Sequence, residues 1–177
     1  MIETERLILR RWREADIVPY AAMMADPAVA DWLGGVQTAE KAKASLARRE
    51  AVFEAFGLGM WAVERRRDAV FLGAVGLDPV EDDMPFAPGV EAAWRMARHA
   101  WGAGYATEAA RAAINDGFAR CGLAEILAVT ARTNLRSQAL MRRLGFTPQP
   151  WRDFDHVRLA PDDPLRPHVV YALLDRN

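Results

Sequence analysis

Residues 94–109, which read WRMARHAWGAGYATEA, constrain the fold of this chain more than any other stretch. An apolar, strand-like run ends at Met96, and a helix-like run begins near Tyr105. Gly102 and Gly104 lie in the loop between them, where glycine lets the backbone approach a ligand closely. The free N–H groups and the dipole of a helix N-terminus favour an anion. The stretch therefore predicts a strand–loop–helix site for a phosphate-rich ligand.

The bulk properties predict one domain over residues 1–177 and exclude several classes of protein. A chain of 177 residues can bury a hydrophobic core without disulfides or a structural metal. Its net charge of −1 gives no overall signature of nucleic-acid binding. No run approaches the ~20 apolar residues of a membrane span, and the N-terminus does not resemble a signal peptide. Cys121 is the single cysteine, and we expect it to be buried or half-buried. A chain without a disulfide framework suits the reducing cytoplasm, and no membrane partner is expected.

Hydrophobic periodicity and turn residues predict an α/β (α+β) domain. The predicted strands are residues 5–12, 60–65, 70–77, 90–96, 125–131, 147–154 and 168–174, and the predicted helices are 15–24, 38–56, 105–120 and 135–144. Thr38 is the expected N-cap of its helix, in which Ala42, Leu46, Arg49 and Phe53 share one side. Residues 90–131 form one βαβ unit, and the other strands are expected to pair mostly antiparallel. We therefore expect a mixed, mostly antiparallel twisted sheet flanked by helices.

Several local sequences, in a fixed order, carry a resemblance to a known family. They are Thr4-Glu5-Arg6-Leu7-Ile8-Leu9-Arg10, residues 101–109, Asn134-Leu135-Arg136-Ser137, Leu144-Gly145-Phe146 and His168-Val169-Val170-Tyr171. Each motif is weak alone, but together they cover nearly the whole chain. The chain resembles the GNAT superfamily of N-acetyltransferases, and more closely its RimJ/RimL-type branch of ribosomal-protein N-acetyltransferases and relatives. The resemblance implies a GNAT-type sheet with a central βαβ unit that binds acyl-CoA.

The same resemblance implies acetyl-CoA as co-substrate. No metal is expected, because His156 and His168 are far apart in sequence and no cysteine or carboxylate spacing supports a metal site. The glycine loop would hold the pyrophosphate through backbone N–H groups, and the strand ending at Met96 would bind the pantetheine arm. The family has Gln or Arg three residues before the first loop glycine, where this chain has His99, beside Arg98. The predicted cofactor-binding residues are Met96, Ala97, Arg98, His99, Gly102, Ala103, Gly104, Tyr105, Ala106, Asn134 and Ser137.

Two residues at the start of the 135–144 helix have roles implied by the resemblance. Asn134 is expected to contact the pantetheine amide, although alone it would be an ordinary N-cap. Ser137, one turn on, is expected to stabilise or protonate the departing thiolate; the alternative is a small residue packed beside the cofactor. Many relatives carry a tyrosine acid where this chain has Met141, which cannot donate a proton.

A general base is needed because an amine is mostly ammonium at neutral pH. Glu91, near the start of the strand that leads to the glycine loop, is the candidate. It shares one face of that strand with Arg95, so an ion pair between the two is the alternative interpretation. The carboxylates Asp78, Glu81, Asp82 and Asp83 lie in or near the 79–89 loop. They would either attract a cationic amine or be simply solvated.

The resemblance, together with these residues, implies an N-acetyltransferase. An acetyl group would move from acetyl-CoA to a primary amine, on a protein N-terminus or a small molecule, by direct attack in a ternary complex. The enzyme would be a monomer or a homodimer. One alternative is a non-catalytic acyl-CoA-binding or sensor module on a GNAT fold. Another is a dinucleotide-binding site. Gly102 and Gly104 match the first two glycines of its motif, but Thr107 stands in place of the third.

Overall fold

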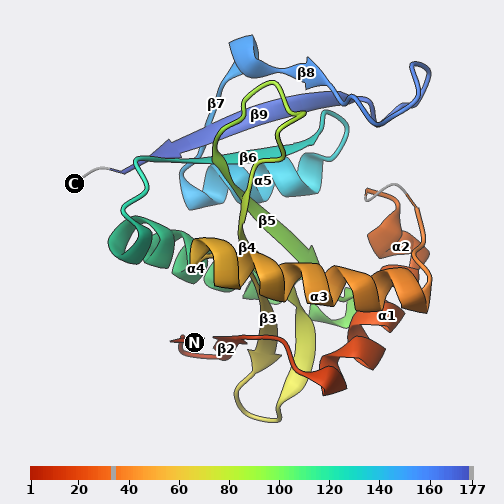
Figure 1. Ribbon diagram of the computed structural model, residues 1–177, viewed down its shortest axis with the longest axis vertical. Helices are drawn as coiled ribbons and strands as arrows, with labels where there is room; N and C mark the ends of the chain where they lie inside the picture. Colours follow the sequence, from red (N-terminus) through yellow and green to blue (C-terminus); the bar gives the residue numbers. More distant parts are fainter. Residues whose placement is uncertain (33–34, 176–177) are drawn as a thin grey trace.

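The computed structural model describes residues 1–32 and 35–175, in which strands form one sheet flanked by helices (Figure 1). The strands are β1 (Ile2–Glu3), β2 (Leu7–Arg10), β3 (Met60–Arg65), β4 (Val70–Pro79), β5 (Val90–Met96), β6 (Glu125–Ala131), β7 (Thr147–Pro148), β8 (Phe154–Asp155) and β9 (Pro167–Leu174). The helices are α1 (Ile17–Ala25), α2 (Pro27–Ala30), α3 (Ala39–Phe56), α4 (Tyr105–Cys121) and α5 (Leu135–Leu144). Cys121, at the end of α4, is half-buried as expected.

The sheet is mixed and mostly antiparallel, as the sequence predicted. Its strand order is β1-β2-β3-β4-β5-β6-β9-β7, with β8 paired to β9. Among the described strands, β5 and β6 form the one parallel pair, and α4 is the crossover between them. A dinucleotide-binding fold requires a parallel sheet of repeated βαβ units, so this topology rules out that alternative.

Local signals define α3 as predicted. The Thr38 hydroxyl accepts a hydrogen bond of 3.3 Å from the backbone N–H of Lys41 and caps the helix. Gly57 ends the helix with φ +67°, a left-handed conformation that favours glycine. The buried side of the helix consists of Ala42, Leu46, Arg49 and Phe53. Figure 1 shows α3 lying across the sheet at β3 and β4.

Prolines account for two differences from the predicted elements. A short helix, α2, begins at Pro27, where the sequence predicted only the end of the preceding helix; Asp26 caps it by accepting from the Ala28 N–H at 3.0 Å. Proline is well suited to the first helical position because its missing N–H is not needed there. The predicted strand 147–154 is wrong. It is split into β7 and β8 by a 3-10 turn at Pro150–Arg152, since proline cannot donate to a strand ladder.

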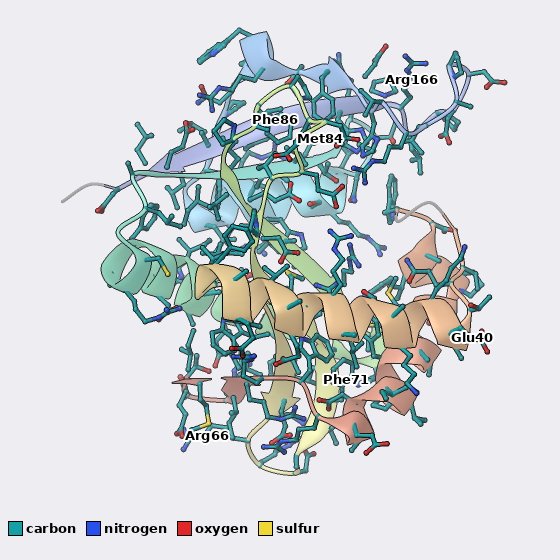
Figure 2. The ribbon with its side chains drawn as sticks, viewed as in Figure 1. Glu40, Arg66, Phe71, Met84, Phe86 and Arg166 are labelled. Carbon is teal, nitrogen blue, oxygen red and sulfur yellow. The ribbon has the colours of Figure 1, made fainter. Side chains whose placement is uncertain are left out.

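The loop between β4 and β5 folds back over the β8–β9 end of the sheet, where Figure 2 labels Met84 and Phe86. The Phe86 ring lies 5.2 Å from the ring of Phe154 in β8. Arg158 pairs with Glu81 and Asp83, and Arg48 of α3 also pairs with Glu81 at 2.5 Å. These two carboxylates are therefore held by arginines rather than left free in a solvated loop.

Alternation along β5 gives its two sides different surroundings. Ala92 and Met96 pack into the hydrophobic cluster that contains Ala109, Ala113 and Ile114 of α4. Ala93 packs against a second cluster, which contains residues of α1 and α3. Glu91 and Arg95 share the side of Ala93. The strand thus separates an α4 side from an α1–α3 side.

Candidate active site

The site lies where β5 and β6 separate. The two strands pair at Glu91 and Leu127 alone, whereas β6 keeps its pairing with β9 as far as Ala131. The carboxyl ends of β5 and β6 therefore diverge, and they open next to the N-termini of α4 and α5. A groove of about 1650 Å³ occupies this opening, which exceeds the ~300–1,000 Å³ of ordinary small-ligand pockets. Its volume suits a long cofactor together with a second substrate.

The glycine loop at the N-terminus of α4 has the geometry of an anion site. Gly104 is the N-cap of α4 with φ +80°, and Gly102 has φ +75°. A Cβ at Gly102 would meet nothing within 4 Å, and one at Gly104 would meet only the Arg6 side chain at 3.5 Å. The Glu108 N–H donates to the Gly104 carbonyl, so the N–H groups of the preceding helical residues have no acceptor within the helix. The loop therefore offers open space and free donors to a phosphate group.

Arg6 fixes this loop to the N-terminal strand. Its Nη1 donates to the Ala103 carbonyl at 3.0 Å, and its Nε donates to Glu108 at 2.7 Å. Thr4 also donates to Glu108, at 2.6 Å. This explains why the Thr4-Glu5-Arg6 motif accompanies the glycine loop, a link that sequence reasoning did not make. Sequence reasoning also missed the arginines on α4 and α5 that line the groove, namely Arg111, Arg136 and Arg143.

A hydrogen-bond chain orients Ser137 at the start of α5. Asn134 caps the helix by accepting from the Ser137 N–H at 3.1 Å, which confirms its interpretation as an N-cap. The Trp94 indole Nε1 donates to the Ser137 hydroxyl at 3.2 Å. Because that oxygen accepts from Trp94, its own hydrogen is available to another acceptor. Met141 is fully buried in the core.

The other predicted cofactor residues fall into two groups. Those that line the groove are Met96, Gly102, Gly104, Tyr105, Ala106, Asn134 and Ser137. The remaining residues, Ala97, Arg98, His99 and Ala103, are not part of that lining. The Ala97 N–H donates to the Leu72 carbonyl at 2.8 Å, and the His99 ring lies 3.1 Å from the Phe71 carbonyl. Figure 2 labels Phe71 beneath α3.

Glu91 is the titratable group of the groove with the most perturbed environment. It is half-buried and lies opposite Asp78 in the β4–β5 register. Burial, and then repulsion from Asp78, raise the pKa of Glu91 to about 7. Among the described residues it forms no ion pair with Arg95, whose positive charge offsets only part of this rise. A carboxyl group with a pKa near 7 can accept a proton at neutral pH.

Three further observations concern metal binding, two histidines of the groove and membrane-spanning helices. Among residues 1–32 and 35–175, no three His, Cys, Asp or Glu side chains are placed to hold a metal ion. The rings of His156 and His168, distant in sequence, lie 4.9 Å apart and both line the groove. No helix in the described part of the chain has the length and apolarity needed to cross a membrane.

Comparisons with known proteins agree with this geometry. The family model described as an acetyltransferase (GNAT) domain matches residues 6–147. The uncharacterized protein YkkB of Bacillus subtilis is 26% identical over 143 residues, which are 80% of this chain and 82% of that protein. An acetyltransferase structure from Agrobacterium tumefaciens aligns with a TM-score of 0.80 and 26% identity, over 98% of this chain and 94% of that one.

A more distant structure shares the fold. RimL, described as a ribosomal L7/L12 alpha-N-protein acetyltransferase in complex with coenzyme A, aligns with a TM-score of 0.78 and 15% identity. The alignment covers 97% of this chain and 95% of that one. With the family match over residues 6–147, the mixed sheet and the groove between β5 and β6, this chain belongs to the GNAT acetyltransferase family.

Proposed function

We propose that this chain is a single-domain N-acetyltransferase that moves an acetyl group from acetyl-CoA to a primary amine. The observation that carries the proposal is the meeting of two chemical groups in one groove. Ser137 enters it from the α5 side, and Glu91 enters it from the α1–α3 side of β5. Acetyl-CoA bound on the α5 side of β5 and an amine bound on the α1–α3 side would meet where β5 and β6 diverge.

The residues present fit coenzyme A. The open glycine loop and the first turn of α4 would bind the pyrophosphate through the N–H groups of Gly104, Tyr105 and Ala106. Arginines 111, 136 and 143 add positive charge along the same groove. The free edge of β5 near Met96 would bind the pantetheine arm as an added strand. Acetyl-CoA supplies the activated acyl group as a thioester.

The chain's own side chains would contribute two proton movements. Glu91 would take the proton from the attacking ammonium, directly or through water, because its pKa lies near neutrality. Ser137, held by the Trp94 indole, would donate to the departing thiolate and would regain the second proton that the acylated nitrogen releases, directly or through water. A strand N–H near Met96 would polarise the thioester carbonyl. The rest of the rate enhancement would come from positioning the two substrates together.

Three features bear on partners, location and oligomeric state. The fold shared with RimL, described as acting on ribosomal L7/L12, is consistent with a protein N-terminus as acceptor, and a small-molecule amine fits the same chemistry. The single half-buried cysteine suits a reducing compartment, so we place the enzyme in the cytoplasm. A monomer or a homodimer satisfies the proposal, since the described groove is lined by one chain.

Titration calorimetry with acetyl-CoA, followed by a free-thiol release assay over a panel of amines and N-terminal peptides, tests the proposal. The double variant Glu91→Gln/Ser137→Ala controls for spontaneous thioester hydrolysis. We expect binding and amine-dependent thiol release that the double variant loses. Binding without release on any acceptor would favour the sensor module, and absence of binding would overturn the assignment of the groove.

A further inference from the structure

Four ionisable side chains form a cluster on the α1–α3 side of β5, which we call the inner charge cluster. It consists of Arg49 of α3, Asp78 of β4, and Glu91 and Arg95 of β5. Arg49 is 6% exposed, with its Nη1 3.8 Å from the Asp78 carboxylate and its Nη2 donating to the Tyr20 hydroxyl at 3.2 Å. Asp78 and Glu91 are directly opposite in register. The cluster thus places two guanidinium groups and two carboxyl groups beside the groove.

The inner charge cluster is incompletely satisfied. The Arg49 Nε and the Asp78 Oδ1 are buried and have no hydrogen-bond partner. The Arg95 side chain forms no ion pair or hydrogen bond with any other described residue, although its charge acts on both Asp78 and Glu91. Folded proteins leave few buried polar groups unpaired, and such groups call for an occupant. The occupant must offer an acceptor to the arginines and a donor to the Asp78 Oδ1.

A small cavity provides room for this occupant. It has a volume of about 70 Å³ and is lined by Ser45, Arg48, Arg49, Val52, Asp78 and Arg95. Because one water takes up ~30 Å³, the cavity holds a group the size of a carboxylate. Arg95 lines both this cavity and the large groove, so its side chain stands at the junction of the two.

From these observations we propose that the acceptor amine carries a carboxylate, which Arg95 binds at the mouth of the small cavity with the Arg49 Nε behind it. The inference rests on the proposed function, whose substrate class it narrows. The amine of the same molecule lies toward Glu91. Glu91 and Arg95 are four residues apart on one strand face, about 13 Å at the Cα atoms. The intervening Ala93 has only a methyl group, which leaves space between the two charged ends.

The charges of the surrounding elements favour a zwitterion over a purely cationic amine. The carboxylates of the loop between β4 and β5 do not neutralise the positive charge of Arg95, because Glu81 and Asp83 are already paired with Arg48 and Arg158. A polyamine would place positive charge against Arg95 and Arg49, which repel it. A free amino acid and a peptide with an acidic residue at its N-terminus share the required amine and carboxylate. The experiment distinguishes these two sources.

The test compares acceptors that differ only in the carboxylate. Free amino acids are compared with their carboxamides, and peptides that begin with Asp or Glu are compared with those that begin with Asn or Gln, by kcat/KM in the thiol-release assay. In a second arm, N-acetylated amino acids and their carboxamides are titrated into the protein saturated with coenzyme A. The variants are Arg95→Gln and Arg95→Lys, with Arg67→Gln in the β3–β4 turn as an exposed-arginine control.

For free amino acids, for peptides or for both, we expect kcat/KM to be at least 10-fold higher with the carboxylate than with the carboxamide. This is about the effect of one charge-assisted hydrogen bond. Arg95→Gln should abolish that preference by raising KM and the probe Kd for carboxylates while leaving carboxamides unchanged, and Arg95→Lys should restore part of it. The inference is overturned if carboxylate and carboxamide acceptors have equal kcat/KM, or if Arg95→Gln lowers kcat/KM equally for both. It is also overturned if no carboxylate probe binds. Loss of acetyl-CoA binding by the parent protein would instead overturn the proposed function.

Discussion

The indole N–H of Trp94 donates a 3.2 Å hydrogen bond to the hydroxyl of Ser137, across the opening between β5 and α5. This bond fixes the serine oxygen as an acceptor and leaves its proton for the groove. Trp94 therefore has a positioning role that its size and hydrophobicity did not reveal. The contact ties the strand that would bind the cofactor to the helix that would protonate the leaving group.

Replacing Ser137 by Ala should lower kcat by about 100-fold, the lower end of general acid–base effects, with little change in the Kd of acetyl-CoA. Trp94→Phe keeps a ring but removes the donor, so kcat should fall by about 2–10-fold, in line with the ~0.5–1.5 kcal/mol of one hydrogen bond. Steady-state kinetics and titration calorimetry measure both effects. Unchanged kcat in Ser137→Ala would assign the serine to packing alone.

The pH dependence of the reaction should report on Glu91. Its pKa is raised to about 7, so the required carboxylate form is lost as the pH falls through 7. The kcat/KM of the parent enzyme should decrease below that pH. Glu91→Gln should lose this limb and lower the rate by about 100-fold at pH 7.5, with a smaller deficit near the pKa of the amine.

The matched control is Glu54→Gln, which removes an exposed carboxylate that pairs with Arg11 and is not among the groups that shift the pKa of Glu91. It should keep the pH profile of the parent enzyme. A profile for Glu91→Gln that superimposes on the parent would point to another base.

A side chain at Gly104 should block the pyrophosphate site. Gly104→Val introduces a branched Cβ where the backbone N–H groups face the ligand, and losing two charge-assisted hydrogen bonds should raise the acetyl-CoA Kd by about 100-fold or more. Gly122→Val, at the other end of α4, is the control because Gly122 also has a positive φ and open space around its Cβ. It should carry similar backbone strain but bind acetyl-CoA normally. Equal affinity losses in the two variants would mean that strain, not obstruction, weakens binding.

A buried charge triad should stabilise the N-terminal part of the fold. Arg10 is 6% exposed and donates to Asp16 at 2.7 Å and to Glu64 at 2.8 Å. Arg10→Met would leave the buried Asp16 without its guanidinium partner and Glu64 with only the longer contact to Arg13 at 3.6 Å, and it should lower the free energy of unfolding by about 3–5 kcal/mol. Arg65→Met, which removes the turn pair with Asp68, should have little effect. Denaturant unfolding measures both, and a similar small change in each would show that the triad contributes nothing special.

The same triad predicts the direction of acid sensitivity. Burial opposes ionisation of Asp16, but hydrogen bonds from Arg10 and from the Arg13 N–H outweigh it and hold the pKa of Asp16 below its usual 3.8. A group with a lowered folded-state pKa contributes stability above its unfolded pKa and loses it as the pH falls. The stability difference between the parent and Asp16→Asn should therefore be full above pH 4 and shrink below it. Urea unfolding at several pH values measures this difference.

The sequence alone determined the features that depend on neighbouring residues. Thr38 and Asn134 cap their helices, and Gly57 and Gly104 take left-handed conformations, because these effects need only a few adjacent positions. Hydrophobic periodicity likewise located α3 and its buried face. It failed at residues 147–154, where Pro150 begins a 3-10 turn that divides the segment into two short strands.

Only the tertiary structure decided the environment of the site. The bond between Arg6 and Glu108 joins residues 102 positions apart, and that between Trp94 and Ser137 joins residues 43 apart. The pKa of Glu91 depends on Asp78, which strand register places opposite it. Register and packing bring such groups together across the chain, and local propensity carries no information about them.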